Sequence, residues 1–403
     1  MDVAPSLPPA RLTLTAATAT AMVFVRDHDS EGVIRQCLID IGVTAPEFKT
    51  GGVNEAITEL ATRPSPRLLI VDVHGVDDPV ARIHDLANVC DPTTGVIVIG
   101  ESNDIRLYRE LKSEGVVEYY FTPLVRTLVM QSCNAIVLGV GSKLPTARTG
   151  KLIFVVGVRG GVGTTTIAVA TAWHLAEDNK RRVCLIDLDM QFGDAALQLN
   201  VAPSHALREA LDHPDRVDEL FLDRGMARAS ERLGVIAALE PLDEATMPSE
   251  AGVMPLLERL LQRNRYVFVD IPMTSAPRLM PMLHLPGTIL LISIGSLVCA
   301  RDVARLREKL GPNSAERTTV HVLNKSGSND GLPDADFIRA IGTPPDVIMP
   351  YSREIAVASR LGVQGLRTCA PLQRALAPVY RQLSGEEPAA AKKWSLSSLF
   401  GKS

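Results

Sequence analysis

Short apolar runs alternate with amphipathic helical patterns along most of the chain. In its first third the apolar runs lie at residues 22–25, 68–73, 95–100 and 117–121, and the helical patterns lie at 31–41, 80–89 and 105–114. Buried strands that alternate with helices are typical of a parallel sheet covered by helices on both faces. We therefore predict a doubly wound α/β domain over residues 21–140, preceded by a flexible N-terminal segment, residues 1–20.

The same alternation returns after a polar stretch that contains glycine, serine, threonine and proline. This stretch, residues 141–150, has the composition of a linker. The apolar run LIFVVGV then opens a second α/β pattern that extends to about residue 383. The sequence thus predicts a second doubly wound, parallel-sheet domain over residues 151–383, followed by a flexible tail over residues 384–403.

Composition narrows the classes of protein that this chain can belong to. Of its 403 residues, 46% are hydrophobic and 22% are charged, as in a soluble globular protein. The net charge is −4 and only 4% of the residues are aromatic, so we expect no nucleic-acid partner. The six cysteines lack metal-ligand spacing and the N-terminus lacks the pattern of a secretory signal, so we expect a cytoplasmic protein with reduced thiols.

A glycine-rich stretch, RGGVGTTT, stands between the first strand of the second domain and a helical pattern. In this context glycines let backbone amides approach an anion, and the start of the helix adds partial positive charge. The threonine hydroxyls that follow are placed to reach phosphate and Mg²⁺. The nucleotide-binding residues that we predict here are Gly160, Gly161, Val162, Gly163, Thr164, Thr165 and Thr166.

Carboxylates follow two further strands of the same domain. RRVCLIDLDMQFGD places Asp187 and Asp189 after one strand, and RYVFVDIP places Asp270 after another. The carboxyl ends of parallel strands meet at one edge of a sheet, where α/β proteins bind ligands. We expect these three aspartates and Thr165 to form a Mg²⁺ site, with Asp189 also positioning an attacking water. A fourth strand, TVHVLNKS, ends in Asn324, whose amide is predicted to read an adenine edge.

These motifs, in this order, resemble those of the ParA/MinD ATPases, which carry a deviant Walker A loop. The stretch DLDMQFGDAALQLNVAPSHALREAL and the later MPYSREIAVASRLGVQ are more similar to CpaE/TadZ proteins, the localisation ATPase-like components of tight-adherence pilus systems. The resemblance covers about residues 151–383. It implies a P-loop fold, ATP and Mg²⁺ as cofactors, and an ATP-dependent homodimer.

Two positions depart from the ATPase pattern. Arg159 stands where the wider family has its signature lysine, and Thr164 stands where it has the Walker lysine. An arginine keeps the charge with a different geometry, whereas a threonine keeps only a hydroxyl. Losing one preorganised group that stabilises transition-state charge costs about 10²–10³ in rate. We therefore expect weak or absent hydrolysis, with Arg159 as a substitute for the signature lysine.

The first domain resembles a response-regulator receiver. RLLIVDVHGVDDP places Asp72 at the phosphoacceptor position, and Asp27 follows the first strand, where receivers hold Mg²⁺. Arg26 precedes Asp27 in place of a second acid, and we expect it to form an ion pair with Asp72. Gly100 and Thr122 replace the hydroxyl and the lysine that a working receiver needs. We thus predict an acid site that is not phosphorylated, in a domain that binds proteins, as in the receiver-like domains of CpaE proteins.

The last twelve residues, KKWSLSSLFGKS, mix large apolar side chains with lysines. If residues 392–403 form a helix, their pattern predicts a weak interfacial membrane anchor. An unstructured tail and a peptide that docks on a partner are the alternatives.

By resemblance, the chain is a pilus assembly factor that positions or recruits the pilus secretion machinery. The partners this implies are a second copy of the chain, the pilus secretion ATPase, and polar or membrane assembly proteins, with the chain located at the cell pole or the inner face of the inner membrane. The alternatives are an active ParA/MinD-type positioning ATPase and, with less support, a phosphorylated response regulator.

Overall fold

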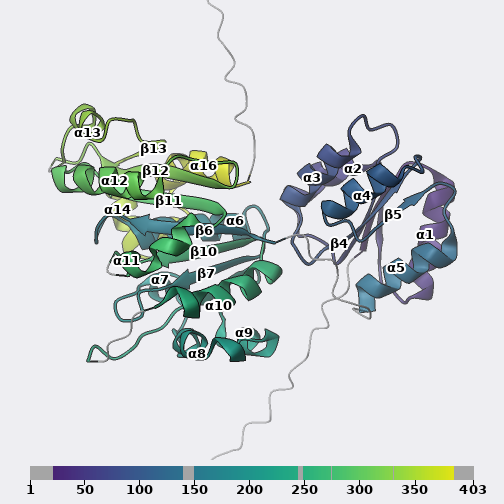
Figure 1. Ribbon diagram of the computed structural model, residues 1–403, viewed down its shortest axis with the longest axis horizontal. Helices are drawn as coiled ribbons and strands as arrows, with labels where there is room; N and C mark the ends of the chain where they lie inside the picture. Colours follow the sequence, from purple (N-terminus) through teal and green to yellow (C-terminus); the bar gives the residue numbers. More distant parts are fainter. Residues whose placement is uncertain (1–20, 139–148, 244–247, 274, 330, 385–403) are drawn as a thin grey trace, which may run out of the picture. The chain divides into compact units, whose positions relative to one another are not determined.

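The computed structural model describes residues 21–138, 149–243, 248–273, 275–329 and 331–384. The predicted N-terminal segment, most of the linker and the tail from residue 385 lie outside the described residues, as does the predicted membrane contact at 392–403. The chain divides into two compact units, each built on its own sheet (Figure 1). Among the helices of the described ranges, none is both long and apolar enough to cross a membrane.

The first unit has a five-stranded sheet in the order β2-β1-β3-β4-β5, and all neighbouring strands run parallel. Its strands are β1 (Ala21–Val25), β2 (Glu47–Thr50), β3 (Leu68–Asp72), β4 (Gly95–Gly100) and β5 (Glu118–Phe121). This order is that of flavodoxin-like folds, in which ligands meet the carboxyl ends of the strands beside the central β1 and β3. The predicted doubly wound, receiver-like fold is therefore confirmed.

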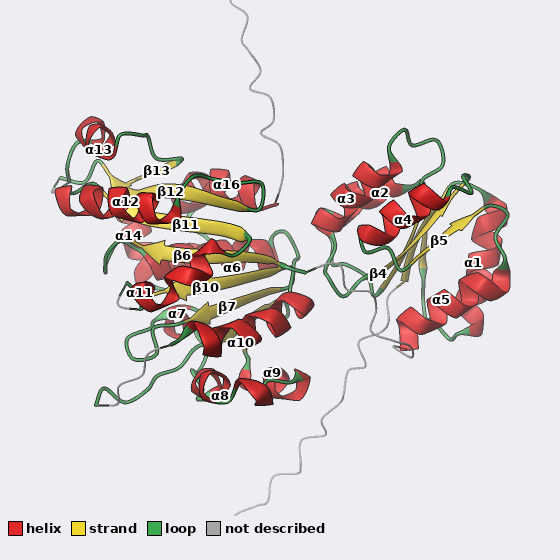
Figure 2. Ribbon diagram, in the orientation of Figure 1, coloured by secondary structure: helices red, strands yellow, loops and turns green. Residues whose placement is uncertain are grey.

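Helices connect these strands and cover both faces of the sheet (Figure 2). They are α1 (His28–Asp40), α2 (Val53–Leu60), α3 (Pro79–Val89), α4 (Ile105–Ser113) and α5 (Arg126–Leu138). The side chain of Asp27 caps α1 by accepting the amide of Ser30 at 2.7 Å, and Asp104 caps α4 in the same way. Strand β2 and helix α2 were not predicted. The sequence EFKT of β2 is short and half polar, as an edge strand can be, and so gives no clear strand pattern.

The second unit has an eight-stranded sheet in the order β13-β12-β11-β6-β10-β7-β9-β8, which is parallel except for the edge strand β8. Its strands are β6 (Lys151–Gly157), β7 (Val183–Asp187), β8 (Ala227–Arg228), β9 (Leu233–Ile236), β10 (Tyr266–Ile271), β11 (Gly287–Ile294), β12 (Arg317–Ser326) and β13 (Val347–Pro350). The central strands are almost wholly apolar because helices cover both faces of the sheet. The second predicted doubly wound domain is confirmed as well.

Helix α6 begins directly after the glycine-rich loop and packs against β6, β7 and β10. The helical segments of this unit are α6 (Thr164–Glu177), α7 (Ala195–Gln198), α8 (Ala206–Asp212), η1 (Pro214–Arg216), α9 (Glu219–Gly225), α10 (Glu250–Arg263), α11 (Ala276–Leu279), η2 (Met280–His284), α12 (Leu297–Leu310), α13 (Asp334–Ile341), α14 (Arg353–Arg360), α15 (Val363–Leu366) and α16 (Ala370–Ser384). The mostly apolar helix α6 thus fixes the position of the loop that precedes it.

A buried histidine on β12 makes the stability of this unit depend on pH. His321 is fully buried, with Nε2 2.8 Å from the Ser293 hydroxyl and Nδ1 3.0 Å from the Arg307 guanidinium. Because arginine only donates, Nδ1 accepts and the ring is neutral. Burial, with Arg307 nearby, lowers the pKa of His321 to about 3.

We expect His321 to destabilise this unit as pH falls. Between the unfolded pKa of about 6.5 and the folded value, only the unfolded chain takes up the proton, at a cost of about 1.4 kcal/mol per pH unit. Lowering the pH to about 5 should thus cost about 2 kcal/mol through this residue. In urea unfolding at about pH 7 and about pH 5, the free energy of unfolding of His321→Gln should fall less than that of the wild type, by this amount. An equal drop in variant and wild type contradicts the assignment.

Candidate functional site

The glycine-rich loop of the second unit connects β6 to α6 and is held by two buried side chains. Val158 and Val162 are buried, and the Val158 amide donates to the carbonyl of Ile292 on the neighbouring strand β11. On either side of Val162 the backbone adopts left-handed conformations, with φ of +78° at Gly161 and +95° at Gly163. Only glycine adopts these conformations readily. The loop therefore turns directly before the N-terminus of α6, and the space beside Gly160 and Gly161 is open.

A pocket of about 690 Å³ lies against this loop. Almost all the nucleotide and metal residues that the sequence predicted line it, namely Arg159, Gly160, Gly161, Gly163, Thr164, Thr165, Thr166, Asp187, Asp189, Asp270 and Asn324. Val162 does not line it, because its side chain points into the core and only its carbonyl is near the other residues. The volume lies within the usual range for small-molecule sites.

Two buried aspartates are neighbours in this pocket. Asp187 on β7 and Asp270 on β10 are register partners in adjacent strands. Burial raises the pKa of Asp187 to about 6, although amides of Asp189 and Ala195 donate to its carboxylate. Burial and the charge of Asp187 also raise the pKa of Asp270, although a hydrogen bond from Thr165 opposes this. A cation bound between them would therefore stabilise the ionised forms of both carboxyl groups.

The chemistry of these groups fits Mg²⁺. Among the residues that the structure describes, none hydrogen-bonds to the buried Asp270 Oδ2 atom, which is costly unless a cation or water reaches it. Within the described residues, no three acidic, histidine or cysteine side chains converge as a preformed metal cage. Mg²⁺ keeps several waters and takes one or two carboxylates together with phosphate oxygens. Thr165, Asp187 and Asp270 are the residues that would hold it.

Asp189 is fixed by the loop that follows β7. Its Oδ1 atom accepts the Phe192 amide at 3.0 Å, and its backbone carbonyl accepts the amide of Gly193. A Cβ atom at Gly193 would lie only 2.3 Å from that carbonyl and 2.5 Å from Asp187 Oδ2, so the turn requires glycine. The loop thereby brings both aspartates to one side of the pocket.

The end of β12 braces the glycine-rich loop. Asn324 Nδ2 donates to the Val162 carbonyl at 2.8 Å, and Lys325 Nζ donates to the Gly161 carbonyl at 3.0 Å. The ladder between β12 and β13 is irregular here, and Lys325 has a φ of +55°, which is strained for a residue other than glycine. Lys325 was not among the predicted site residues, and its position directly after Asn324 was the only signal for it in the sequence.

Arg159 is held by α12. Its Nε atom donates to Asp302 Oδ2 at 2.8 Å, and Arg301 donates to the other carboxylate oxygen. The hydrogen bond from Arg301, together with Arg159, holds the pKa of Asp302 below its ordinary value despite burial. Arg159 is about half exposed, so it lies at the edge of the pocket with its Nε engaged by a carboxylate.

We expect Asp302→Asn to strengthen nucleotide binding. Releasing half-exposed Arg159 from buried Asp302 removes the cost of breaking the ion pair, about 1 kcal/mol, so the affinity for nucleotide should rise about fivefold. Titration with MgATP measures it. The control is Asp336→Asn, which removes the partner of exposed Arg339 away from the pocket. Unchanged or weaker binding in Asp302→Asn contradicts this role for the pair.

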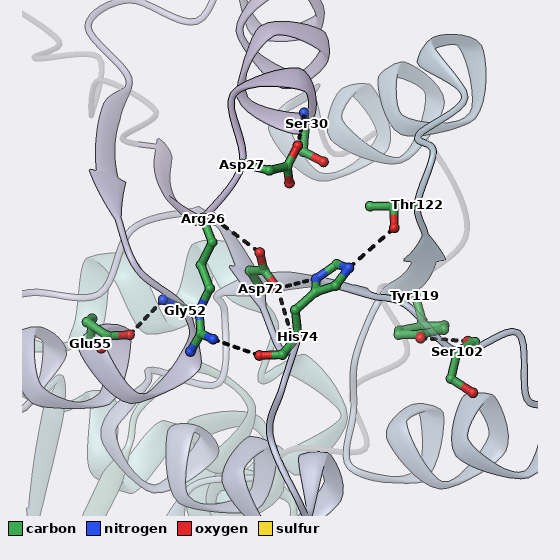
Figure 3. Close-up of polar contacts among 10 residues, drawn as sticks. All are labelled: Arg26, Asp27, Ser30, Gly52, Glu55, Asp72, His74, Ser102, Tyr119 and Thr122. Atoms are coloured by element: carbon green, nitrogen blue, oxygen red, sulfur yellow. Dashed lines mark hydrogen bonds and ion pairs between the residues drawn. The ribbon is translucent and has the colours of Figure 1, made fainter.

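The acid site of the first unit has an unexpected partner. The carboxylate of Asp72 accepts the His74 ring at 2.5 Å and the His74 amide at 2.7 Å on Oδ1, and the Arg26 amide at 3.2 Å on Oδ2 (Figure 3). The guanidinium of Arg26 donates instead to the carbonyl oxygen of His74. The expected ion pair between Arg26 and Asp72 was therefore wrong: His74 takes that place because it is two residues away on the same strand end.

The other altered receiver positions are also filled. Gly100 has no room for a side chain, because a Cβ atom there would lie 2.6 Å from the Tyr119 hydroxyl, which donates to the Ser102 carbonyl. The Thr122 hydroxyl lies 3.3 Å from His74 Nε2. The carboxylate of Asp27 is used in capping α1.

Solved structures of other proteins identify the type of fold of the second unit. No protein-family model and no curated protein sequence matches the chain. A ParA family ATPase from Chlorobium tepidum TLS is 19% identical, with 58% of this chain and 98% of that chain covered and a TM-score of 0.50. MinD, a cell division ATPase from Pyrococcus furiosus, is 17% identical, with 59% and 99% covered and a TM-score of 0.45. The fold of the second unit, with its loop and strand-end aspartates, is that of a ParA-type P-loop protein.

The family follows from a second solved structure. The pilus assembly protein CpaE from Caulobacter crescentus CB15 is 32% identical, with 98% of that chain and 29% of this chain covered and a TM-score of 0.27. On this sequence identity over nearly all of the solved protein, the chain belongs to the CpaE family. The resemblance stated from the sequence motifs is thus confirmed.

Proposed function

We propose that this protein is a pilus assembly and localisation factor that binds ATP with Mg²⁺ and hydrolyses it slowly or not at all. One observation carries the proposal. The loop and the aspartates form a complete pocket, but Thr164 stands where a cation is needed and Arg159 is engaged by Asp302. Binding a phosphate chain needs amides and a metal, whereas transferring a phosphoryl group needs further positive charge at the transition state.

The charges lining the pocket make binding depend on Mg²⁺. Its charged lining residues are the cations Arg159 and Lys325 and the acids Asp187, Asp189, Asp194 and Asp270. An unchelated triphosphate meets an excess of negative charge, which a divalent cation offsets. When bound, Mg²⁺ supplies charge neutralisation between the phosphates. The role of Asp187 and Asp270 is to orient it, and that of the loop amides is to hold the phosphates.

Phosphate release tests the proposal on turnover. With saturating MgATP, we expect the wild-type protein to release phosphate at a rate close to that of MgATP alone, since the glycine-rich loop contains no lysine. Turnover at the rate of an ordinary ATPase that disappears in Asp189→Ala would favour the alternative, an active positioning ATPase of the ParA/MinD type.

We further propose that ATP favours a homodimer that closes over the pocket. Large apolar side chains stand exposed at its mouth: Phe192 is 73% exposed and Tyr351 is 54% exposed, and both line the pocket. Leu197, at the nearby α7, is 81% exposed. Exposed apolar groups of this kind mark a surface that another protein covers.

We expect MgATP to shift the chain from monomer to dimer in size-exclusion chromatography with light scattering. Phe192→Ser should weaken that shift, because it removes apolar surface that only the dimer buries. Its control is Leu220→Ser, which replaces an apolar residue of α9 that is 55% exposed and absent from the pocket lining. Equal shifts in both variants would place the contact elsewhere.

The pilus role is proposed from the family. The Caulobacter crescentus relative is a pilus assembly protein, so the partners proposed here are the pilus secretion ATPase and polar or membrane assembly proteins. In a pilus-forming host, a fluorescent fusion should form polar foci that Asp270→Asn reduces. Foci that depend on neither the pocket nor the pilus genes would contradict this role.

A further inference from the structure

An oriented imidazole stands at the acid site of the first unit. His74 Nδ1 lies 2.5 Å from Asp72 Oδ1, and Asp72 is only 1% exposed. An ionised carboxylate can only accept, so Nδ1 donates and, in the neutral ring, the lone pair is on Nε2. The backbone amide of His74 donates to the same oxygen, which fixes the residue at both its main chain and its ring.

The second ring nitrogen points away from the carboxylate. Nε2 faces the Thr122 hydroxyl at 3.3 Å and accepts its long hydrogen bond (Figure 3). The His74 side chain is 24% exposed, so solvent reaches the ring. A nucleophile or base held by a buried carboxylate on its far side is the arrangement by which enzymes activate histidine. The same hydrogen bonds make Asp72 a poor acceptor for a phosphoryl group, because it is buried and both of its oxygens are engaged.

We propose that His74 is a phosphoryl acceptor and that Nε2 is the atom modified. The donor class is a molecule that carries phosphoryl on nitrogen or on a carboxylate. In the step, the Nε2 lone pair forms a bond to phosphorus while the bond from phosphorus to the donor nitrogen or oxygen breaks, and the leaving group keeps that electron pair. The Nδ1 proton stays in its hydrogen bond to Asp72, which offsets the positive charge that the ring gains.

The neighbouring residues suit this role. The Thr122 hydroxyl, beside Nε2, can donate to a phosphoryl oxygen. Arg26 Nη1 donates to the His74 carbonyl at 2.8 Å, which helps to fix the main chain of the residue proposed to be modified (Figure 3).

Labelling of the full chain with a small donor tests the proposal. Wild type is incubated with phosphoramidate and, in parallel, with acetyl phosphate, and the adduct is located by peptide mass spectrometry. We expect an acid-labile, alkali-stable phosphoryl group on His74. His74→Gln should abolish it, and Asp72→Asn should slow its formation by about 10²-fold, as loss of an assisting acid or base group does. Thermal unfolding of each variant shows whether the unit remains folded.

His28→Gln is the matched control, because His28 lies in the same unit and its side chain is fully exposed. It should leave the label on His74 unchanged. Equal labelling of His28 and His74 in wild type would show that modification follows exposure alone and would overturn the proposal. So would no label with either donor, or an alkali-labile label that persists in His74→Gln and is lost in Asp72→Asn, which would assign the acceptor to Asp72.

Discussion

A Thr164→Lys variant is expected to hydrolyse ATP about 10²–10³-fold faster than the wild-type protein. The glycine-rich loop and the strand-end aspartates line the same pocket, and Asn324 and Lys325 brace the loop. The missing part is a cation that neutralises charge developing between the phosphates. A lysine at this position, at the start of α6, supplies it. Phosphate release at saturating MgATP measures the gain.

The control for this gain is the double variant Thr164→Lys with Asp189→Ala. If the new activity arises in this pocket, removing the residue proposed to position water returns the rate to the wild-type level. A gain that survives Asp189→Ala would point to a contaminating enzyme or another site. If Thr164→Lys binds MgATP and gains no activity, the loss of catalysis does not lie at position 164.

Asp270→Asn is expected to have opposite effects on binding and stability. Binding of MgATP should be lost, because the buried oxygen proposed to face Mg²⁺ is replaced. Without nucleotide, the free energy of unfolding should rise by about 1–3 kcal/mol near neutral pH, the range for an unsatisfied buried polar group. The gain arises because the amide can donate to the neighbouring Asp187 and removes a like charge.

The size of the effect on stability depends on pH. A carboxyl whose folded pKa lies above its unfolded value destabilises the fold fully above the folded pKa, and this cost disappears as pH falls toward the unfolded value of about 4. Urea unfolding of Asp270→Asn should therefore gain most near neutral pH and least in acid. Exposed Asp215→Asn should change neither binding nor stability. An Asp270→Asn variant that is less stable near neutral pH would contradict the electrostatic account.

The residues of the proposed nucleotide pocket could be brought together from the sequence because they follow strands. Glycines, threonines and aspartates that stand directly after buried strands must meet at one edge of a parallel sheet, whatever the distances between them along the chain. The order of these motifs along the chain was enough to predict both the fold of the second unit and the family. The chain position of Asp187 and Asp270 was enough to bring them together, as their register in β7 and β10 shows.

The contacts that change the chemistry were not predictable in this way. Arg159 and Asp302 are 143 residues apart, and nothing in the pattern of α12 indicates that one of its carboxylates turns to the loop. His74 also replaced the expected partner of Asp72, because the turn after β3 brings its ring back to the carboxylate. Both contacts depend on rotamers and loop conformations, which hydrophobic periodicity does not determine.

The most direct test of the central claim is a calorimetric titration of the full chain with ATP, in the presence and in the absence of Mg²⁺. The account predicts saturable binding with Mg²⁺, binding that is much weaker in its absence, and no continuing heat of hydrolysis after saturation. Asp270→Asn should abolish the saturable signal. Failure to bind at millimolar MgATP would contradict the account and leave the second unit as a scaffold, and sustained hydrolytic heat would make it an active ATPase.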